Sequence, residues 1–579
     1  MRLELDVADP AALAADHLAL ATGAEPAEKA ARYAAAGDLY AGPLADPAAA
    51  RELYREALAY RPGDHLLLTK SLGLVAGDGD WSYSLDLLQR LIDTEQDPVV
   101  RARYRHVAAM ILRDELGRRD DAAVALAGAL DDAPTLFAAA ADLEALLDET
   151  TEPAKRIFFY YRRLEQLRHE TCPPGELLRL RDRLGELCLA VGRREDALCA
   201  FEVALTFAPD DLARRQRLAS LYLEAGDDHV DDAIAQHQEI LSRNRRRTVS
   251  YEALAALYER SGRRPQAQAC EEALAVIGMR AVDSGRFRAV RPLTGGVPTA
   301  LDADAWRVLA GEAVDVQLSA LFALVTPAVA AARARLRPPP RRSVGAKLDD
   351  GDLPIARALR RAIGVLGVPR PPAFVDREQA APCRIVLRSA DGVLAPALMV
   401  GPAALDGSLD ERALAFTVAR RLADLHAEWF ARLLCPRTDE LIQLVELAIV
   451  LGAGGDADPA SPRERAAQWL ASSLHPVALD HVVALGRKLR ARAIDPGRAA
   501  LDWLEATDRA ADRVGLVVAG DLATCVRALE LEPSVRSDKQ DRILELVWSS
   551  VTEDVLAVRA RVEGWSLAAG APAAARDAR

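Results

Sequence analysis

The chain has 579 residues and a formal net charge of −12; hydrophobic residues make up 50% of it and aromatic residues only 5%. A chain of this length is too long for one hydrophobic core, so two or three domains are expected, and the acidic balance argues against a nucleic-acid-binding protein. Because the apolar residues are mostly Ala, Leu and Val, we expect closely packed helices.

The N-terminus and the cysteines predict where the protein resides. Acidic residues stand where a signal peptide would need a basic end, and no run approaches the roughly 20 apolar residues that span a bilayer. The seven cysteines contain no C-x-x-C pair, and we expect Cys188 and Cys199 to be buried and inert. These features predict a soluble, cytoplasmic protein with no membrane span, and the high Ala, Arg and Asp content is typical of a GC-rich bacterial genome.

Residues 1–28 are predicted to form an N-terminal helical segment, after which a spaced pattern of small and large residues begins. One copy of the pattern consists of Gly37, Tyr40, Ala50, Tyr54, Ala57 and Pro62. The second half of another copy consists of Ala122, Leu126, Ala129 and Pro134. The segments 81–91 and 156–167 are predicted helices of more divergent copies.

The same pattern is clearest over residues 178–278. Leu184 and Gly185 lie where a second helix must approach the first, and Ala197 on that second helix faces back. Gly192 suits the turn between the two helices, and Pro209 ends the second one. Two further units follow, marked by Leu218, Ala219, Tyr222, Gly226 and Ala233, and then by Tyr251, Leu254, Ala255, Tyr258, Gly262 and Ala267.

A frame of about 34 residues with these positions resembles the tetratricopeptide repeat. The resemblance implies an α-α superhelical solenoid over residues 29–278, whose groove takes a peptide or helix from a protein partner. The polar candidates for lining that groove are Arg214, Arg215, Arg217, Tyr222 and Tyr251. The alternative is an irregular helical array of similar composition.

Residues 279–345 are predicted to be a linker with connecting helices. Turn-forming residues cluster at 283–285 and 292–298, and the run 337–342 favours an extended, polyproline-like stretch. Helices are expected at 303–314 and 316–335, with an apolar stripe of Trp306, Leu309, Leu318, Leu321, Phe322 and Val325.

Residues 346–565 are predicted to form the last domain, followed by a frayed tail at 566–579. It begins with a helix near 353–366, followed by short strand-like runs at 373–375, 384–388 and 397–400. A long helix over 410–434 follows, with Ser408 or Asp410 as its N-cap, and further helices come after it. The predicted fold class is therefore mainly α, a helical solenoid followed by a helical domain with a small β-sheet.

This order of elements, together with two short motifs, resembles the gluzincin zinc metallopeptidases, whose catalytic helix reads A-F-x-x-x-H-E-x-x-H. The corresponding helix begins Ala415-Phe416 but has Arg420 and Asp424 at the two ligand positions and Arg421 at the position of the general base. The family's later E-x-x-A-D motif corresponds to residues 508–512, where Asp508 replaces the ligand Glu and the final Asp512 is kept.

The replaced residues decide what the resemblance implies. Catalytic zinc needs about three protein ligands, and two arginines at that place would repel the cation. We expect Arg420 and Arg421 to form ion pairs with Asp424, Asp508 and Asp512 in a folded domain with no catalytic residue, metal or cofactor.

The remaining residues offer no substitute for the missing ligands. His426 would lie about 200° round the helix from Asp424, so it cannot replace the lost histidine. The sequence also contains no phosphate-binding loop, nucleophile elbow or kinase signature.

The predicted function is a protein-interaction scaffold or adaptor that is not an enzyme. One alternative is a metal-dependent hydrolase with Asp424, His426 and Asp508 as atypical ligands. Another is a regulatory subunit whose degenerate domain holds a segment of a partner, and a third is that the last domain is a plain helical domain. The sequence does not predict the partner or the oligomeric state.

Overall fold

The computed structural model describes residues 9–75, 79–148, 152–167, 172–278, 299–336, 345–348, 351–390, 393–454, 461–532 and 538–564. The chain forms two compact units, Met1–Ala225 and Gly226–Arg579. The predicted linker segments 283–285 and 292–298, the proline-rich run 337–342 and the tail 566–579 lie outside the described residues.

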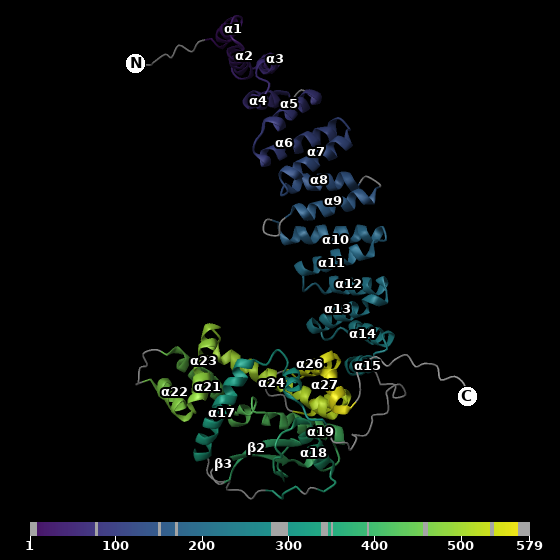
Figure 1. Ribbon diagram of the computed structural model, residues 1–579, viewed down its shortest axis with the longest axis vertical. Helices are drawn as coiled ribbons and strands as arrows, with labels where there is room; N and C mark the ends of the chain where they lie inside the picture. Colours follow the sequence, from purple (N-terminus) through teal and green to yellow (C-terminus); the bar gives the residue numbers. More distant parts are fainter. Residues whose placement is uncertain are drawn as a thin grey trace, which may run out of the picture. The chain divides into compact units, whose positions relative to one another are not determined.

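The first unit is a series of helices in which each packs against the next along the chain (Figure 1). They are α1 Pro10–Ala21, α2 Pro26–Ala41, α3 Pro47–Tyr60, α4 His65–Val75, α5 Trp81–Thr94, α6 Pro98–Met110, the π-helical η1 Ile111–Glu115, α7 Arg119–Asp132, α8 Phe137–Asp148, α9 Pro153–Gln166, α10 Pro174–Ala190, α11 Arg194–Phe207 and α12 Leu212–Ala225. This is the predicted helical-repeat architecture, although the expected limit at residue 28 falls inside α2.

Glycine at two helix crossings explains why the pattern of small and large residues forms pairs. A Cβ atom on Gly185 of α10 would lie 2.6 Å from Cζ of Phe201 on α11, and one on Gly37 of α2 would lie 2.6 Å from Cε1 of Tyr54 on α3. Only glycine lets the aromatic ring of the next helix come this close. Gly192, between α10 and α11, has φ +80°, as predicted for the turn.

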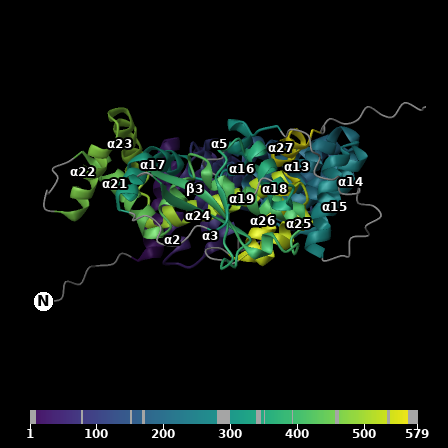
Figure 2. The same cartoon turned by 90° about the horizontal axis from the view of Figure 1, so that it is seen from below.

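The second unit begins with repeat helices. These are the short η2 Asp227–His229, α13 Val230–Arg243, α14 Thr248–Arg260 and α15 Arg264–Gly278. Helix α15 packs against α25 Leu522–Leu531 and α26 Lys539–Val551, and Figure 1 shows the teal α15 next to the yellow C-terminal helices that include α26. Figure 2 shows α15 on the same side as α25 and α26. The last repeat helices therefore belong to the same compact unit as the C-terminal domain, and the expected domain limit at residue 278 does not separate them.

The rest of the second unit combines helices with one small sheet. Its other helices are α16 Ala303–Ala310, α17 Val316–Leu336, α18 Pro354–Leu366, η3 Pro402–Ala404, α19 Glu411–Leu422, η4 Ala423–Leu425, α20 Ala431–Leu434, α21 Thr438–Ala453, α22 Pro462–Ser473, α23 Pro476–Ala491, α24 Pro496–Ala519 and α27 Glu553–Glu563. Strands β1 Ala373–Val375, β2 Cys383–Ala390 and β3 Val393–Val400 pair in the order β1-β3-β2, with β1 parallel and β2 antiparallel to β3. The predicted strands are confirmed.

Helix α17 corrects the expectation that no stretch approaches the length and apolarity of a membrane span. Among the described residues, Val316–Arg335 is long and apolar enough to cross a membrane by length and composition. Leu321, Phe322 and Val325 on this helix are fully buried in the core of the unit, and Arg333 pairs with Glu440 of α21 at 2.6 Å. A third of this apolar stretch is buried within the unit.

The predicted helix over 410–434 is wrong in its length. Asp410 caps the start of α19 as expected, accepting a hydrogen bond from the backbone N–H of Ala413 at 2.8 Å, but the α-helix ends at Leu422. The chain then turns through η4 and reaches an extended residue at His426, and the indole of Trp429 is buried in the core. This turn carries the short helix α20 back toward α24.

One cysteine also departs from its prediction. All seven cysteines lie within the described residues, and Cys199 alone is exposed. The neighbouring Leu198 and Ala200 of α11 are buried, together with Ala197 and Phe201. Position 199 therefore falls on the opposite side of the helix from the repeat core.

Candidate functional site

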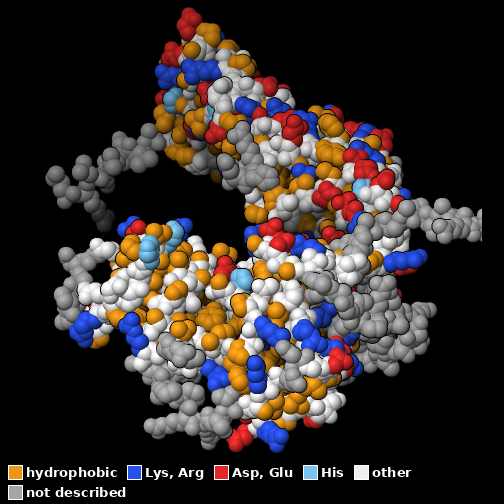
Figure 3. Space-filling view, turned by 60° about the horizontal axis from the view of Figure 1, so that its bottom comes forward, with side chains coloured by type: hydrophobic (Ala, Val, Ile, Leu, Met, Phe, Trp, Pro, Cys, Tyr) orange, Lys and Arg blue, Asp and Glu red, His pale blue; other side chains and the backbone are white. Residues whose placement is uncertain are grey.

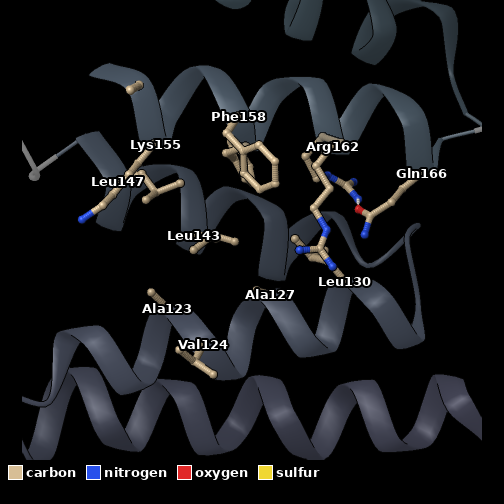
Figure 4. Close-up of a pocket in the computed structure, with 13 residues that line it drawn as sticks. Ala123, Val124, Ala127, Leu130, Leu143, Leu147, Lys155, Phe158, Arg162 and Gln166 are labelled. Atoms are coloured by element: carbon tan, nitrogen blue, oxygen red, sulfur yellow. Dashed lines mark hydrogen bonds between the residues drawn. The ribbon is translucent and has the colours of Figure 1, made fainter. Parts of the chain in front are cut away.

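The first unit contains an open apolar groove between α7 and α9, with α8 at its base (Figure 4). Its volume is about 490 Å³. The apolar residues that line it are Ala123, Val124, Ala127 and Leu130 of α7, Leu143 and Leu147 of α8, and Ala154, Phe158 and Phe159 of α9. The volume lies within the range of sites that hold a ligand or the side chains of a partner.

Small residues on α7 and large ones on α9 create the groove. The short side chains of Ala123 and Ala127 on α7 leave space between the two helices. Phe158 on α9 borders this space, and 65% of its surface is exposed. Val124 on the opposite wall is 73% exposed, whereas Leu130 of the same helix is buried. Two large apolar side chains therefore flank a concave apolar surface and remain in contact with solvent.

One end of the groove is closed by polar contacts. Arg162 of α9 donates to both carboxylate oxygens of Asp131 on α7, at 2.7 and 2.8 Å, and Gln166 donates to the same carboxylate at 2.8 Å. The buried Arg163 donates to the carbonyl oxygen of Pro134 at 2.8 Å. These bonds tie α9 to α7 and to the turn after α7, so the groove is bounded at this end.

Lys155 is the remaining charged residue that lines the groove. Its Nζ lies 2.9 Å from Glu152, and the side chains of the pair are 65% and 62% exposed. An ion pair this exposed contributes little to stability and exchanges readily with another partner. Among the described residues, the ionisable ones that line the groove are Lys155, Arg162 and Arg163, which are cationic.

Sequence reasoning missed the groove, although α9 carries a signal for it. Residues 157–161 read Ile-Phe-Phe-Tyr-Tyr, which places five large apolar or aromatic residues in succession on one helix. A helix buries about one face, so some of them must point outward. Ile157, Phe159 and Tyr160 are buried, whereas Phe158 is 65% and Tyr161 is 39% exposed.

Three of the residues predicted to line a repeat groove are instead buried. Tyr251 is fully buried and donates to the carbonyl oxygen of Arg245 at 3.2 Å, and Tyr222 donates to Glu202 of α11 at 2.6 Å. Arg215 is also buried, and its Nε donates to the carbonyl oxygen of Pro209 at 3.0 Å. The prediction is wrong for these three because large positions of the repeat frame fill the space between helices.

The other two predicted residues join neighbouring repeats. Arg214 of α12 forms an ion pair with Asp182 of α10. Arg217, also on α12, lies 3.5 Å from Glu186 of α10. The guanidinium of Arg217 also stacks over Phe201, 4.7 Å from the ring centroid.

Equivalent ion pairs occur earlier in the first unit. Arg179 of α10 lies 2.8 Å from Glu144 of α8, and Arg113 of η1 lies 2.9 Å from Asp142, also of α8. Acidic and basic side chains are also interspersed on the face shown in Figure 3. Charges at these positions of the repeats thus pair with one another.

In the second unit, the residues predicted for a degenerate peptidase site lie in a buried cluster of charges. Arg420 of α19 donates from Nε to Oδ1 of Asp512 on α24 at 2.5 Å and also pairs with Glu532, which lies just after α25. Arg421 donates to the same Glu532 at 2.9 Å. Arg420, Asp512 and Glu532 are each 5% exposed or less.

The two remaining predicted acids pair with an arginine that sequence reasoning missed. Arg432 of α20 lies 3.1 Å from Asp424 and also forms an ion pair with Asp508. The turn after α19 brings this guanidinium into the cluster. Burial raises the pKa of Asp424, against the opposing effect of Arg432.

Counted over the residues that the structure describes, the cluster is balanced in charge. Asp512 accepts hydrogen bonds from Arg542 of α26, at 2.8 Å to Oδ1 and 2.9 Å to Oδ2. The four arginines are Arg420, Arg421, Arg432 and Arg542, and the four acids are Asp424, Asp508, Asp512 and Glu532. Each acid faces a guanidinium, so the expected pairing of Arg420 with Asp512 is present and is part of a larger network.

These residues do not fit a catalytic zinc ion. Zinc in such a site is bound by imidazole and carboxylate groups that are free to face the metal. The four acids face guanidinium groups, and the His426 ring is stacked on Trp306, with ring centroids 4.4 Å apart. Within the described ranges, no group of three or more His, Cys, Asp or Glu side chains is arranged to hold a metal ion.

No protein-family model and no curated protein matches the chain. Among solved structures, it is similar to the MamA protein, with 15% identity and a TM-score of 0.16 over 37% of this chain and 91% of that one. It is similar to the C-terminal part of a TPR repeat-containing protein from Cytophaga hutchinsonii, with 12% identity and a TM-score of 0.22 over 44% and 98% of the chains.

A further similarity is to the TPR2AB domain in the pHSP90 complex of yeast Sti1, with 13% identity and a TM-score of 0.20 over 44% and 93% of the chains. At these TM-scores the similarities carry no argument of their own. The assignment to a helical-repeat fold therefore depends on the helix pairs described above.

Proposed function

We propose that the chain is a non-catalytic protein-interaction scaffold that binds a partner in the α7–α9 groove. The observation that carries the proposal is the exposure of Phe158 and Val124, at 65% and 73%, on the two walls of an apolar cavity of about 490 Å³. Exposed aromatic side chains beside a concave apolar surface are typical of protein-binding sites.

In this proposal the C-terminal part of the chain is a folded domain without peptidase activity. The pairing of Arg420 with Asp512 and of Arg432 with Asp424 and Asp508 supports it, because these guanidinium groups occupy the carboxylates that a metal would need. A gluzincin-like origin of the domain remains a hypothesis that depends on the sequence motifs at 415–424 and 508–512. The seven free cysteines favour a reducing compartment such as the cytoplasm.

Site-specific photocrosslinking tests the binding function. A photoreactive residue at Val124 is expected to capture one defined protein in cells of the source organism. The matched control is the same residue at Leu66, which is 62% exposed on α4 of the same unit. A partner captured at Val124 and absent at Leu66 supports the proposal, whereas identical patterns at both positions contradict it.

Elemental analysis tests the non-catalytic part of the proposal. We expect no stoichiometric transition metal in the purified chain or in an Asp508→Ala variant. Metal at near-unit occupancy that is lost in Asp508→Ala would overturn this part and favour a hydrolase with atypical ligands.

A further inference from the structure

We infer that the α7–α9 groove accepts an acidic amphipathic helix of a partner protein. The inference depends on the proposed binding function and adds the shape and charge of what is bound. Three properties of the groove carry it, namely its length, its open rim and the sign of its charged residues.

The length of the walls matches a helix. Helices α7 and α9 have 14 residues each, which corresponds to about 21 Å at a rise of about 1.5 Å per residue. Figure 4 shows apolar side chains along both walls, from Ala123 and Lys155 at one end to Leu130 and Gln166 at the other. A partner helix of about four turns lying along the groove would place side chains at i, i+3, i+4 and i+7 on this surface.

The open rim favours a macromolecule over a small ligand. A small apolar ligand is usually enclosed, with most of its surface buried. Here Phe158 and Val124 project from the rim with most of their surface exposed, while Leu130 and Phe159 on the same two walls are buried. A helix lying on the groove would cover the rim residues as well as the base.

The charged residues favour acidic groups on the partner. Within the described part of the chain, the ionisable side chains that line the groove are cationic, and Arg162 and Arg163 are already engaged with Asp131 and with the carbonyl oxygen of Pro134. Lys155 forms an exposed ion pair with Glu152. A carboxylate on the partner helix can replace Glu152 at Lys155, whereas a basic group there would be repelled.

Synthetic helices test the inference on the full chain. The probe is a fluorescent peptide of about 15 residues with Leu at i, i+3, i+4 and i+7 and Glu on its flanks. A second peptide has Lys in place of Glu, and a third has the same composition with Leu at alternate positions, so that it forms no apolar helix face. Binding is measured by fluorescence anisotropy.

We expect the acidic helix to bind at least about tenfold more tightly than either other peptide. Phe158→Ala should weaken its binding about tenfold or more, while Leu66→Ala on α4 should leave it unchanged. Lys155→Glu should abolish the preference for Glu over Lys. Because Phe158 and Lys155 are exposed, these variants should keep the circular dichroism and melting temperature of the parent chain.

The inference is overturned if the Lys peptide binds as tightly as the Glu peptide, if Phe158→Ala has no effect, or if no peptide binds. A protein crosslinked at Val124 together with any of these results would leave the scaffold function in place and reject only the acidic helix. Failure of both the crosslinking and the peptides would reject the binding function itself.

Discussion

The guanidinium Nε of Arg420 on α19 lies 2.5 Å from Oδ1 of Asp512 on α24, where both side chains are buried. Arg542 donates to the same carboxylate from a third helix, α26. The carboxylate of Asp512 thus accepts hydrogen bonds from arginines on two helices and connects both helices to α24. Because buried ions are costly without partners, this carboxylate should matter more to folding than any exposed acid.

Replacing that carboxylate is the first prediction. Asp512→Asn should lower the free energy of unfolding by about 3–5 kcal/mol, because Arg420 and Arg542 would remain buried with less compensation. Urea unfolding measures the loss. The control is Asp304→Asn, which removes a pair with Arg307 in which both side chains are more than 70% exposed and should leave stability unchanged. Equal stability of the two variants would contradict the prediction.

Helix contacts in the repeats can be tested at two glycines. Gly185→Ala should destabilise the chain by about 1–3 kcal/mol, because the new methyl group would overlap the ring of Phe201. Gly73→Ala on α4, where nothing lies within 4 Å, should instead stabilise it by about 0.5–1 kcal/mol. Thermal melting distinguishes the two outcomes, because the melting temperature should fall in Gly185→Ala and rise in Gly73→Ala. Adding Phe201→Leu to Gly185→Ala should restore part of the loss, and no rescue would mean that the contact is not the cause.

A buried histidine predicts how stability depends on pH. Burial, assisted by the charge of Arg247, lowers the pKa of His237 to about 4. An unfolded chain binds the proton near pH 6.5, so between about pH 6.5 and pH 4 the unfolded state holds more protons than the folded state. The contribution of neutral His237 to the free energy of unfolding is therefore complete above about pH 6.5. It is lost as the pH falls from there toward pH 4.

The free energy of unfolding is expected to fall by about 2 kcal/mol between about pH 7.5 and pH 5 because His237 is buried in its neutral form. Urea unfolding followed by tryptophan fluorescence measures it, because the buried Trp306, Trp429 and Trp503 lie in the same unit as His237. His237→Asn should remove this part of the pH dependence, whereas His481→Asn at an exposed position should not. The same pH dependence in His237→Asn and the parent chain would contradict the assignment.

The cysteines provide the fourth prediction. Burial raises the pKa of the Cys270 and Cys383 thiols to about 12 and that of Cys435 to about 11, while Cys199 is exposed. Since the thiolate is the reactive form, one thiol of the seven should react with Ellman's reagent at neutral pH and all seven after denaturation. Cys199→Ser should remove the reaction of the native protein. Rapid reaction of several thiols in the folded chain would contradict this burial.

Elements determined by nearby residues could be predicted from the sequence. The α10–α11 pair depends on Gly185 and Phe201, which lie 16 positions apart in one repeat frame, and the N-cap at Asp410 depends on residues within one turn. The strands were also predictable, because short runs of apolar residues are separated by turn formers. In each case the contact that determines the local structure lies within one helix or strand or between two that are neighbours in the sequence.

Features that depend on distant residues could not be predicted. Arg432 reaches Asp508 only because the chain turns at His426, and Glu532 joins the charge cluster from the end of α25. The groove also escaped prediction, since the sequence of α9 shows an excess of aromatic residues without showing that Phe158 would remain uncovered. Such relationships arise from tertiary packing.

The contact of α15 with α25 and α26 has a consequence for how the repeats end. The last helix of a repeat array leaves an apolar face that needs a terminal cap. Here Cys270 and Ala273 of α15 are fully buried. Arg245 in the turn before α14 and Arg263 in the turn before α15 pair with Glu545 of α26 and Glu553 of α27. Helices α25 and α26 therefore serve as the cap of the repeats. A fragment that ends at residue 278 would expose the apolar face of α15 and would tend to aggregate.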